Sequence, residues 1–134
     1  MNNKKSVAVF MWFGDKLMLS ERKTTYKGMW AAAGGSVEPS DITLTNAAQR
    51  EVLEETGHYG HINDFVIVDS YDHDGWRCFL FEYKAYGENG FRDIKNKEPK
   101  KHGPWKLFTV EEALALNLMP AIREYLVDKK KNKG

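Results

Sequence analysis

The chain has 134 residues and a formal net charge of +1, from 20 basic and 19 acidic side chains. This length fits one domain with a real core, and the balanced charge argues against a stable nucleic-acid partner or a membrane surface, because both select for a clear basic excess. Cys78 is the only cysteine, which excludes an internal disulfide and a cysteine-based metal cage and fits a reducing, cytoplasmic setting.

The N-terminal residues are predicted to form a β-hairpin. Apolar runs at 6–13 and 16–22 flank Gly14 and Asp15, a pattern typical of two strands joined by a tight turn. The first run ends at Gly14 without a small-residue cleavage site, so a strand is favoured over a signal peptide. No apolar stretch in the sequence is long enough to span a membrane.

A helix is predicted further along the chain. Residues 24–35 are expected to be a loop that ends in a glycine pair, and residues 37–41 a turn. Apolar side chains then recur at helical spacing over residues 43–56. Gly57 stands just past this segment, where glycine commonly ends a helix.

Two strands are predicted at 62–71 and 76–86, joined by a turn at 72–75. The turn carries His73 between two aspartates, which we interpret as a polar turn rather than a metal site. Cys78 lies in the second strand, and we interpret it as a buried structural thiol rather than a nucleophile.

The C-terminal part is predicted to combine one long loop with short elements. The polar segment 87–103 is rich in Gly and Lys and is expected to be a mobile loop. It is followed by a strand at 104–109, a helix at 110–116 that begins after a capping threonine, and a last helix at 121–130 with proline in its first turn.

The arrangement of these elements indicates a single α/β domain. Strands precede, separate and follow the helices, which predicts one mixed β-sheet with helices packed on its faces. We expect this domain to occupy residues 1–128. Residues 129–134 are expected to be a basic, disordered tail.

Three carboxylates are predicted to share one side of the helix. Glu51 stands three residues before Glu54 and four before Glu55, and like charges at these spacings destabilise an exposed helix by about 0.2–0.5 kcal/mol per pair. Arg50 can pair with Glu54, but one arginine cannot neutralise three carboxylates. Either this is a solvated acidic edge, or a hard divalent cation such as Mg²⁺ binds to these oxygens.

Residues 34–58 resemble the Nudix box, the signature of Nudix (MutT-like) hydrolases. That pattern reads Gly, five residues, Glu, seven residues, Arg-Glu, an apolar residue, any residue, Glu-Glu, any residue, Gly and an apolar residue. Residues 27–30 and 98–114 are also similar to the family's usual surroundings of the box. The resemblance implies the Nudix fold, a mixed β-sheet sandwiched between α-helices. The matching positions are Gly35, Arg50, Glu51, Val52, Glu54, Glu55 and Gly57.

The sequence departs from the box at several positions. Asp41 stands where the family has its first Glu, and one extra residue lies between Asp41 and Arg50. His58 replaces the final apolar residue, and Ala33 stands where many members carry proline. A shorter aspartate with an inserted residue can still reach Arg50, so we expect the changes to alter the loop more than the metal ligands. They also leave open an inactive, nucleotide-binding regulator.

The resemblance implies Mg²⁺-dependent hydrolysis, with Mn²⁺ as an alternative cofactor, of a nucleoside diphosphate linked to another group. Arg50 would orient the carboxylates. The general base would be Glu54 or Glu98, and the alternative for Glu98 is an ordinary solvated loop residue. The implied metal ligands are three carboxylates and one carbonyl, from Glu51, Glu54, Glu55 and Gly35.

Several further residues are candidates for substrate contacts. Arg22 either binds a phosphate or pairs with Glu21 at the surface, and Gly34 lets the backbone approach a phosphate closely. Trp30 either stacks on a base or packs in the core. In nucleoside triphosphate pyrophosphatases of the family, the start of the last helix helps line the base pocket. The corresponding candidates, with plain packing as the alternative, are Met119, Ala121 and Ile122.

The small size and the segment 98–105 most resemble enzymes that convert a (deoxy)nucleoside triphosphate to the monophosphate and pyrophosphate. The expected partner is therefore a small-molecule nucleotide. Alternatives are hydrolysis of a nucleotide sugar, a dinucleotide or an RNA 5′ end, or binding without turnover. Many relatives form dimers, so the resemblance also implies a homodimer as one oligomeric state.

Overall fold

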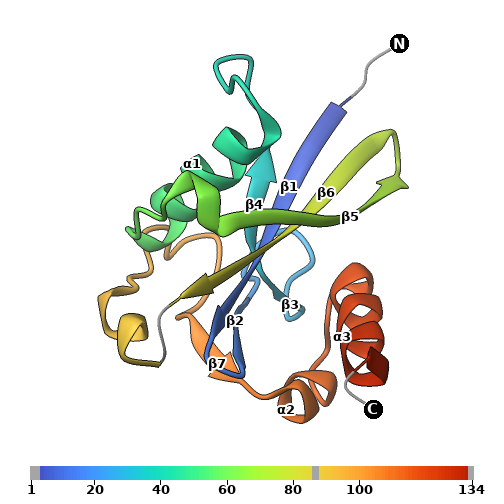
Figure 1. Ribbon diagram of the computed structural model, residues 1–134. Coiled ribbons are helices and arrows are strands. Elements are labelled where there is room, and N and C mark those ends of the chain that lie inside the picture. The colour runs from blue at the N-terminus through green and yellow to red at the C-terminus, as the bar shows by residue number, and fades with distance from the viewer. Residues whose placement is uncertain (1–3, 86–87, 133–134) are drawn as a thin grey trace.

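The computed structural model describes residues 4–85 and 88–132, and Figure 1 shows their arrangement. Short 3-10 helices, η1 and η2, accompany the α-helices and strands. Within the described ranges the elements are β1 (Lys4–Phe13), β2 (Lys16–Glu21), β3 (Trp30–Ala31), β4 (Ala33–Ser36), α1 (Leu44–Thr56), η1 (Ile62–Asp64), β5 (Phe65–His73), β6 (Trp76–Ala85), η2 (Glu88–Asp93), β7 (Lys106–Phe108), α2 (Val110–Leu114) and α3 (Pro120–Asn132).

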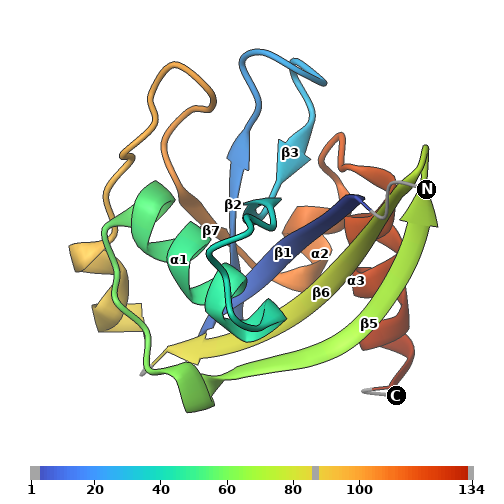
Figure 2. The same ribbon diagram turned by 90° about the horizontal axis from the view of Figure 1, so that it is seen from above.

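The strands form one mixed sheet in the order β3-β2-β1-β6-β5, with β4 also pairing to β1 and β7 to β2. β1 and β6 run parallel, and the other strand pairs are antiparallel. Helix α1 lies on one side of the sheet and α3 on the other (Figures 1 and 2). The predicted α/β class, a mixed sheet between helices, is confirmed.

Two apolar cores lie on opposite faces of the sheet. Strand β1 is buried on both faces because its side chains alternate between them. The core against α1 includes Val9, Met11, Ala47, Val52 and Phe81. The core against α2 and α3 includes Phe10, Trp12, Cys78, Val110, Ile122 and Leu126, which confirms Cys78 as a buried thiol.

Local hydrogen bonds fix both ends of α1, where sequence and structure agree. The Thr43 hydroxyl accepts a hydrogen bond from the backbone N–H of Asn46, and the Asn46 side chain accepts one from the N–H of Thr43. Gly57 has φ of 76°, a left-handed conformation that glycine adopts without strain, and its N–H donates to the Leu53 carbonyl.

Both predicted hairpin pairings are present. Strands β1 and β2 join at Gly14, whose φ is 66°. Strands β5 and β6 pair from Phe65 to His73, and they turn at Asp74 and Gly75. Nε2 of the exposed His73, at the end of β5, lies 3.1 Å from Oδ2 of the exposed Asp74, in agreement with a polar segment at this turn. Residue 86, at the predicted end of the second strand, lies outside the described residues.

The predicted loop over 24–35 is wrong at its C-terminal end, where β3 and β4 form. Their sequences contain mostly Ala and Gly, which have little strand propensity of their own. These strands exist because they pair with β2 and β1, as in the contact of Gly35 with Val7. This is a tertiary effect that local sequence does not encode.

The predicted mobile loop over 87–103 is also more ordered than expected, although residue 87 lies outside the described residues. It begins with η2, and the N–H groups of Lys95 and Lys97 donate to the carbonyls of Thr56 and Glu55. These bonds tie the segment to the C-terminal end of α1.

The expected disorder of 129–134 is wrong over residues 129–132, where α3 continues to Asn132. Lys129 holds this last turn because its ammonium forms an ion pair with Glu82 on β6. Residues 133–134 lie outside the described residues. No helix in the described ranges is long and apolar enough to cross a membrane.

Candidate metal-binding and catalytic site

Two glycines of β4 allow close approaches, one to helix α1 and one to strand β1. A Cβ at Gly35 would lie 1.9 Å from Oε2 of Glu51, and a Cβ at Gly34 would lie 2.2 Å from the Val7 carbonyl oxygen. Both distances are shorter than any real contact. Gly35 therefore lets the Glu51 carboxylate of α1 stand beside the β4 backbone, and Gly34 lets β4 lie close against β1.

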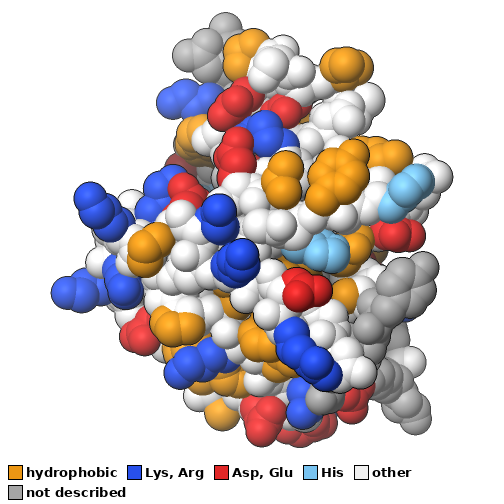
Figure 3. All heavy atoms as spheres, turned by 90° about the vertical axis from the view of Figure 1, so that its left-hand side faces the viewer, with side chains coloured by type: hydrophobic (Ala, Val, Ile, Leu, Met, Phe, Trp, Pro, Cys, Tyr) orange, Lys and Arg blue, Asp and Glu red, His pale blue; other side chains and the backbone are white. Residues whose placement is uncertain are grey.

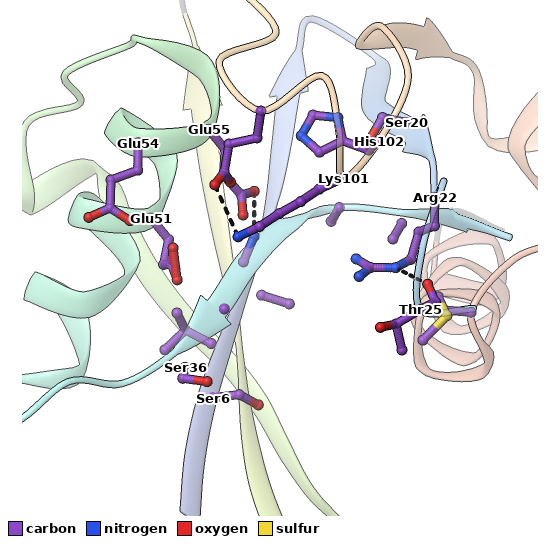
Figure 4. Close-up of a pocket in the computed structure, with 18 of the residues that line it drawn as sticks. Ser6, Ser20, Arg22, Thr25, Ser36, Glu51, Glu54, Glu55, Lys101 and His102 are labelled. Carbon is purple, nitrogen blue, oxygen red and sulfur yellow. Dashed lines mark hydrogen bonds and ion pairs between the residues drawn. The ribbon is translucent and has the colours of Figure 1, made fainter. Parts of the chain in front are cut away.

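The three carboxylates of α1 differ in exposure. Glu51 and Glu55 are only 7% and 8% exposed, whereas the side chain of Glu54 is 51% exposed. All three belong to the lining of one cavity, and Figure 4 shows Glu51 and Glu55 pointing into it. The N–H of Gly34 donates to Oε1 of Glu55 at 3.0 Å, which orients this buried side chain.

Burial raises the pKa of both buried carboxyls. Loss of solvation raises the pKa of Glu51 to about 7 and that of Glu55 to about 8, and the charge of neighbouring carboxylates adds to both shifts. The Gly34 N–H opposes the shift of Glu55, and Arg50 opposes that of Glu51. A bound cation would favour the ionised forms, so the residues present fit a divalent metal.

Arg50 is held by Asp41, in spite of the extra residue between them. Nε and Nη2 of Arg50 donate to the two carboxylate oxygens of Asp41, each at 2.9 Å. Arg50 also donates to the Ser36 carbonyl at 3.0 Å and to Glu54 at 3.1 Å. The expectation that the shorter aspartate still reaches Arg50 is confirmed.

The segment after η2 brings a fourth carboxylate to the site. Oε2 of Glu98 lies 3.0 Å from the ammonium of Lys101. Carboxylate oxygens of Glu55 and Glu98 and a ring nitrogen of His102 all lie within 4.8 Å of one another. The indole N–H of Trp105 donates to the Glu55 carbonyl at 3.2 Å, which fixes this segment against α1.

These groups line one cavity of about 690 Å³, a size suited to a nucleotide. Figure 4 shows Arg22 and Thr25 across the hollow from the glutamates. On the face shown in Figure 3, acidic side chains gather near the top, and Lys and Arg side chains are scattered over the face below them. The predicted site residues in the lining are Arg22, Gly34, Gly35, Arg50, Glu51, Glu54, Glu55, Glu98 and Met119.

The family model described as the NUDIX domain matches residues 2–129. The chain belongs to the NUDIX domain family. This membership supports an enzyme of the pyrophosphohydrolase class that acts on small nucleotides. Nudix hydrolases generally use a divalent metal, in agreement with the acidic site.

Solved structures share the fold. The MutT NUDIX hydrolase of Burkholderia pseudomallei is 21% identical, with a TM-score of 0.78 over 94% of this chain and 97% of that one. The ORF135 protein of E. coli is 25% identical, with a TM-score of 0.72 over 100% and 93%. The bifunctional NMN adenylyltransferase/ADP ribose pyrophosphatase of Francisella tularensis is 16% identical, with a TM-score of 0.75 over 96% and 42%. A comparison with curated proteins finds no match.

Three predicted substrate contacts of this Nudix domain lie outside the cavity lining. Trp30 packs edge-on against Phe108, with ring centroids 5.2 Å apart. Ile122 is buried in the core beneath α3. Ala121 lines a different cavity, beside α3. The structure supports the packing alternative for Trp30 and Ile122, and it places Ala121 beside α3, in the lining of the second cavity.

Arg22 and Met119 do line the cavity. Nε of Arg22 donates to the Thr25 carbonyl at 2.6 Å, which bends the β2–β3 connection around the guanidinium. The N–H of Met119 donates to the Trp30 carbonyl at 3.1 Å, so the start of α3 is attached to the cavity wall.

Sequence reasoning assigned no role to Lys101 or His102, although both line the cavity. Both residues belong to the segment 98–105, whose resemblance to the family could have pointed to them. Their proximity to the carboxylates depends on how this segment folds back onto α1, which no local pattern reports.

Proposed function

We propose that this Nudix domain hydrolyses a (deoxy)nucleoside triphosphate to the monophosphate and pyrophosphate with Mg²⁺, or alternatively Mn²⁺, as cofactor. The observation that carries the proposal is the cavity itself. It places the carboxylates of α1 and of Glu98 on one side and the guanidinium of Arg22 on the other, in a volume that suits a nucleotide. The carboxylate side would hold a divalent cation, and the guanidinium of Arg22 would bind a phosphate.

The residues that would hold the metal are Glu51, Glu54, Glu55 and the carbonyl of Gly35. A bound divalent cation supplies charge neutralisation on the phosphate oxygens and acidifies a water molecule. Arg50 positions the carboxylates, because it is anchored by Asp41 while it donates to Glu54.

Hydrolysis requires a base for the attacking water. The water oxygen forms a bond to one phosphorus of the anhydride, the bridging P–O bond breaks, and pyrophosphate leaves with that electron pair. The proton passes to a carboxylate, for which we propose Glu54 or Glu98. Arg50 orients Glu54 at 3.1 Å, and Lys101 orients Glu98 at 3.0 Å, so one basic side chain holds each carboxylate.

The lining on the Arg22 side supports a nucleotide as substrate. Thr24, Thr25 and Tyr26 offer hydroxyl and backbone groups, and Ala32 and Met119 offer apolar surface for a base. Gly34 leaves room for a phosphate beside the backbone. We therefore expect the phosphates to lie between Arg22 and α1.

The test is product analysis with the eight common nucleoside triphosphates, ADP-ribose, nucleotide sugars, dinucleoside polyphosphates and a 5′-triphosphate RNA. Wild type and Glu54→Gln are compared with and without Mg²⁺. We expect Mg²⁺-dependent formation of monophosphate and pyrophosphate that falls sharply in Glu54→Gln. Release of no pyrophosphate from any of the eight would overturn the proposal. A sugar phosphate or a shortened RNA end would point to another substrate, and binding without turnover to a regulator.

The assembly and location are also proposals. Val66, Ile67 and Val68 are exposed on β5, an edge strand of the sheet, which supports a homodimer. Light scattering at several protein concentrations tests this. We place the protein in the cytoplasm, because its one cysteine is a buried, unpaired thiol.

A further inference from the structure

The imidazole of His102 is buried at the wall of the cavity with one nitrogen unpaired. The residue is only 5% exposed, and Nε2 is buried without a hydrogen-bond partner among the described residues. A buried nitrogen with no partner costs free energy, so such an atom needs a reason to be there.

The other ring nitrogen fixes the tautomer. Nδ1 of His102 lies 2.9 Å from the Gly103 carbonyl oxygen. A carbonyl oxygen only accepts hydrogen bonds, so Nδ1 carries the hydrogen and the neutral ring presents a lone pair at Nε2. An imidazole with one nitrogen bonded to a backbone carbonyl and the other free is the usual arrangement of a metal-binding histidine.

The ring is held rigidly in this orientation. It lies against Trp105, with centroids 4.5 Å apart, and the side chain of Asn96 donates to the His102 carbonyl at 3.0 Å. A ligand atom placed by such contacts loses little conformational entropy when it binds.

The ring of His102 stands beside two carboxylates. A ring nitrogen of His102 and carboxylate oxygens of Glu55 and Glu98 all lie within 4.8 Å of one another. Ligand atoms on opposite sides of one ion are about 4.2 Å apart, because each metal–oxygen bond is about 2.1 Å. A small side-chain rotation therefore brings the three groups around one cation.

We propose that Nε2 of His102, with Glu55 and Glu98, forms a mixed nitrogen–oxygen cation site that favours Mn²⁺ over Mg²⁺. The inference deepens the proposed function, because Glu55 and Glu98 belong to the same cavity. An imidazole suits transition metals, whereas Mg²⁺ prefers oxygen ligands alone. The ammonium of Lys101 pairs with Glu98 at 3.0 Å and would compete with a cation for this carboxylate.

The test uses pulsed EPR of the full chain loaded with Mn²⁺, which detects nitrogen bound directly to the metal without any turnover. We expect nitrogen modulation in wild type and in His61→Gln, whose histidine is exposed, and its loss in His102→Gln. The dissociation constant of Mn²⁺ is expected to rise about 10- to 100-fold in His102→Gln, with a smaller change for Mg²⁺.

Bound Mn²⁺ without nitrogen modulation in wild type would overturn the inference. If His102→Gln does not fold, single Gln variants of His58, His61 and His73 that all retain the modulation assign it to His102. Loss of the modulation in any of these three variants would assign the ligand elsewhere. Nitrogen modulation without turnover would support the metal site and overturn the proposed function. Turnover without nitrogen modulation would support the proposed function and overturn the metal site.

Discussion

The contact between Asp41 and Arg50 gives the most quantitative prediction, for the substitution Asp41→Asn. The Asp41 side chain is 5% exposed and accepts two hydrogen bonds from Arg50, each 2.9 Å long. Asparagine has nearly the same shape as aspartate but carries no charge. Its NH₂ group replaces one carboxylate oxygen, so an N–H donor of asparagine would face an N–H donor of Arg50. Arg50 retains its bonds to Ser36 and Glu54.

The expected loss follows from this count of bonds. A hydrogen bond to a charged group contributes about 1.5–3 kcal/mol, and roughly one such bond is lost. We expect the free energy of unfolding at pH 7 to fall by about 2 kcal/mol, which for a domain of this size lowers Tm by about 6–8 °C. Asp41→Glu retains a carboxylate for Arg50 and is expected to cost less.

Urea unfolding followed by circular dichroism measures these differences. Asp15→Asn, in the exposed β1–β2 turn, is the matched control and should stay within about 0.5 kcal/mol of wild type. Arg50 holds the pKa of Asp41 below its usual range, so the difference between wild type and Asp41→Asn should shrink once the pH falls below about 4. An Asp41→Asn protein as stable as the Asp15→Asn control at pH 7 would show that Asp41 does not anchor Arg50.

Three further predictions concern the metal site. Gly35→Ala should lower Mg²⁺-dependent turnover at least about tenfold, because the new Cβ displaces Glu51. Gly90→Ala, whose Cβ meets nothing closer than 3.6 Å, should have the activity of wild type. Because their pKa values are raised, Glu51 and Glu55 bind protons more tightly in the folded, metal-free protein than in the unfolded chain. The resulting stability is fully present below about pH 4.5 and is lost as the pH rises through about 7 for Glu51 and about 8 for Glu55. Urea unfolding in EDTA from pH 5 to 9 should show this decline in the free energy of unfolding, by up to about 1.4 kcal/mol per pH unit for each proton. Saturating Mg²⁺ should make the decline smaller, and a flat profile in EDTA would contradict the claim that burial raises these pKa values. Lys101→Met should tighten Mn²⁺ binding about two- to fivefold in titration calorimetry, because it removes a competing cation from Glu98, and unchanged binding would count against that competition.

Local signals explain what the sequence predicted well. Helix α1 has a capping residue, an apolar stripe and a terminal glycine, and all of them act within a few residues of each other. The carboxylate cluster follows from the same helical spacing, so its convergence in the structure required no knowledge of the fold. The pairing of Arg50 with Asp41 followed from the resemblance to the Nudix box.

What the sequence did not predict depends on contacts between distant segments. Strand β4 has little strand propensity and forms because β1 offers it a partner. His102 reaches Glu55 because the segment after η2 is tied to the end of α1. Ala121 and Ile122 were candidates for the base pocket, with packing as the alternative, and in α3 neither lines the cavity that the carboxylates share.

The most direct test of the account is the Mg²⁺ dependence of pyrophosphate release by wild type, Glu55→Gln and the exposed control Glu124→Gln. We predict no turnover in EDTA and a saturable rise with Mg²⁺ in wild type and Glu124→Gln. Glu55→Gln should need at least about tenfold more Mg²⁺ for half-maximal rate. Turnover in EDTA, or a Glu55→Gln curve that coincides with wild type, would contradict the claim that the carboxylates of α1 hold the cation on which hydrolysis depends.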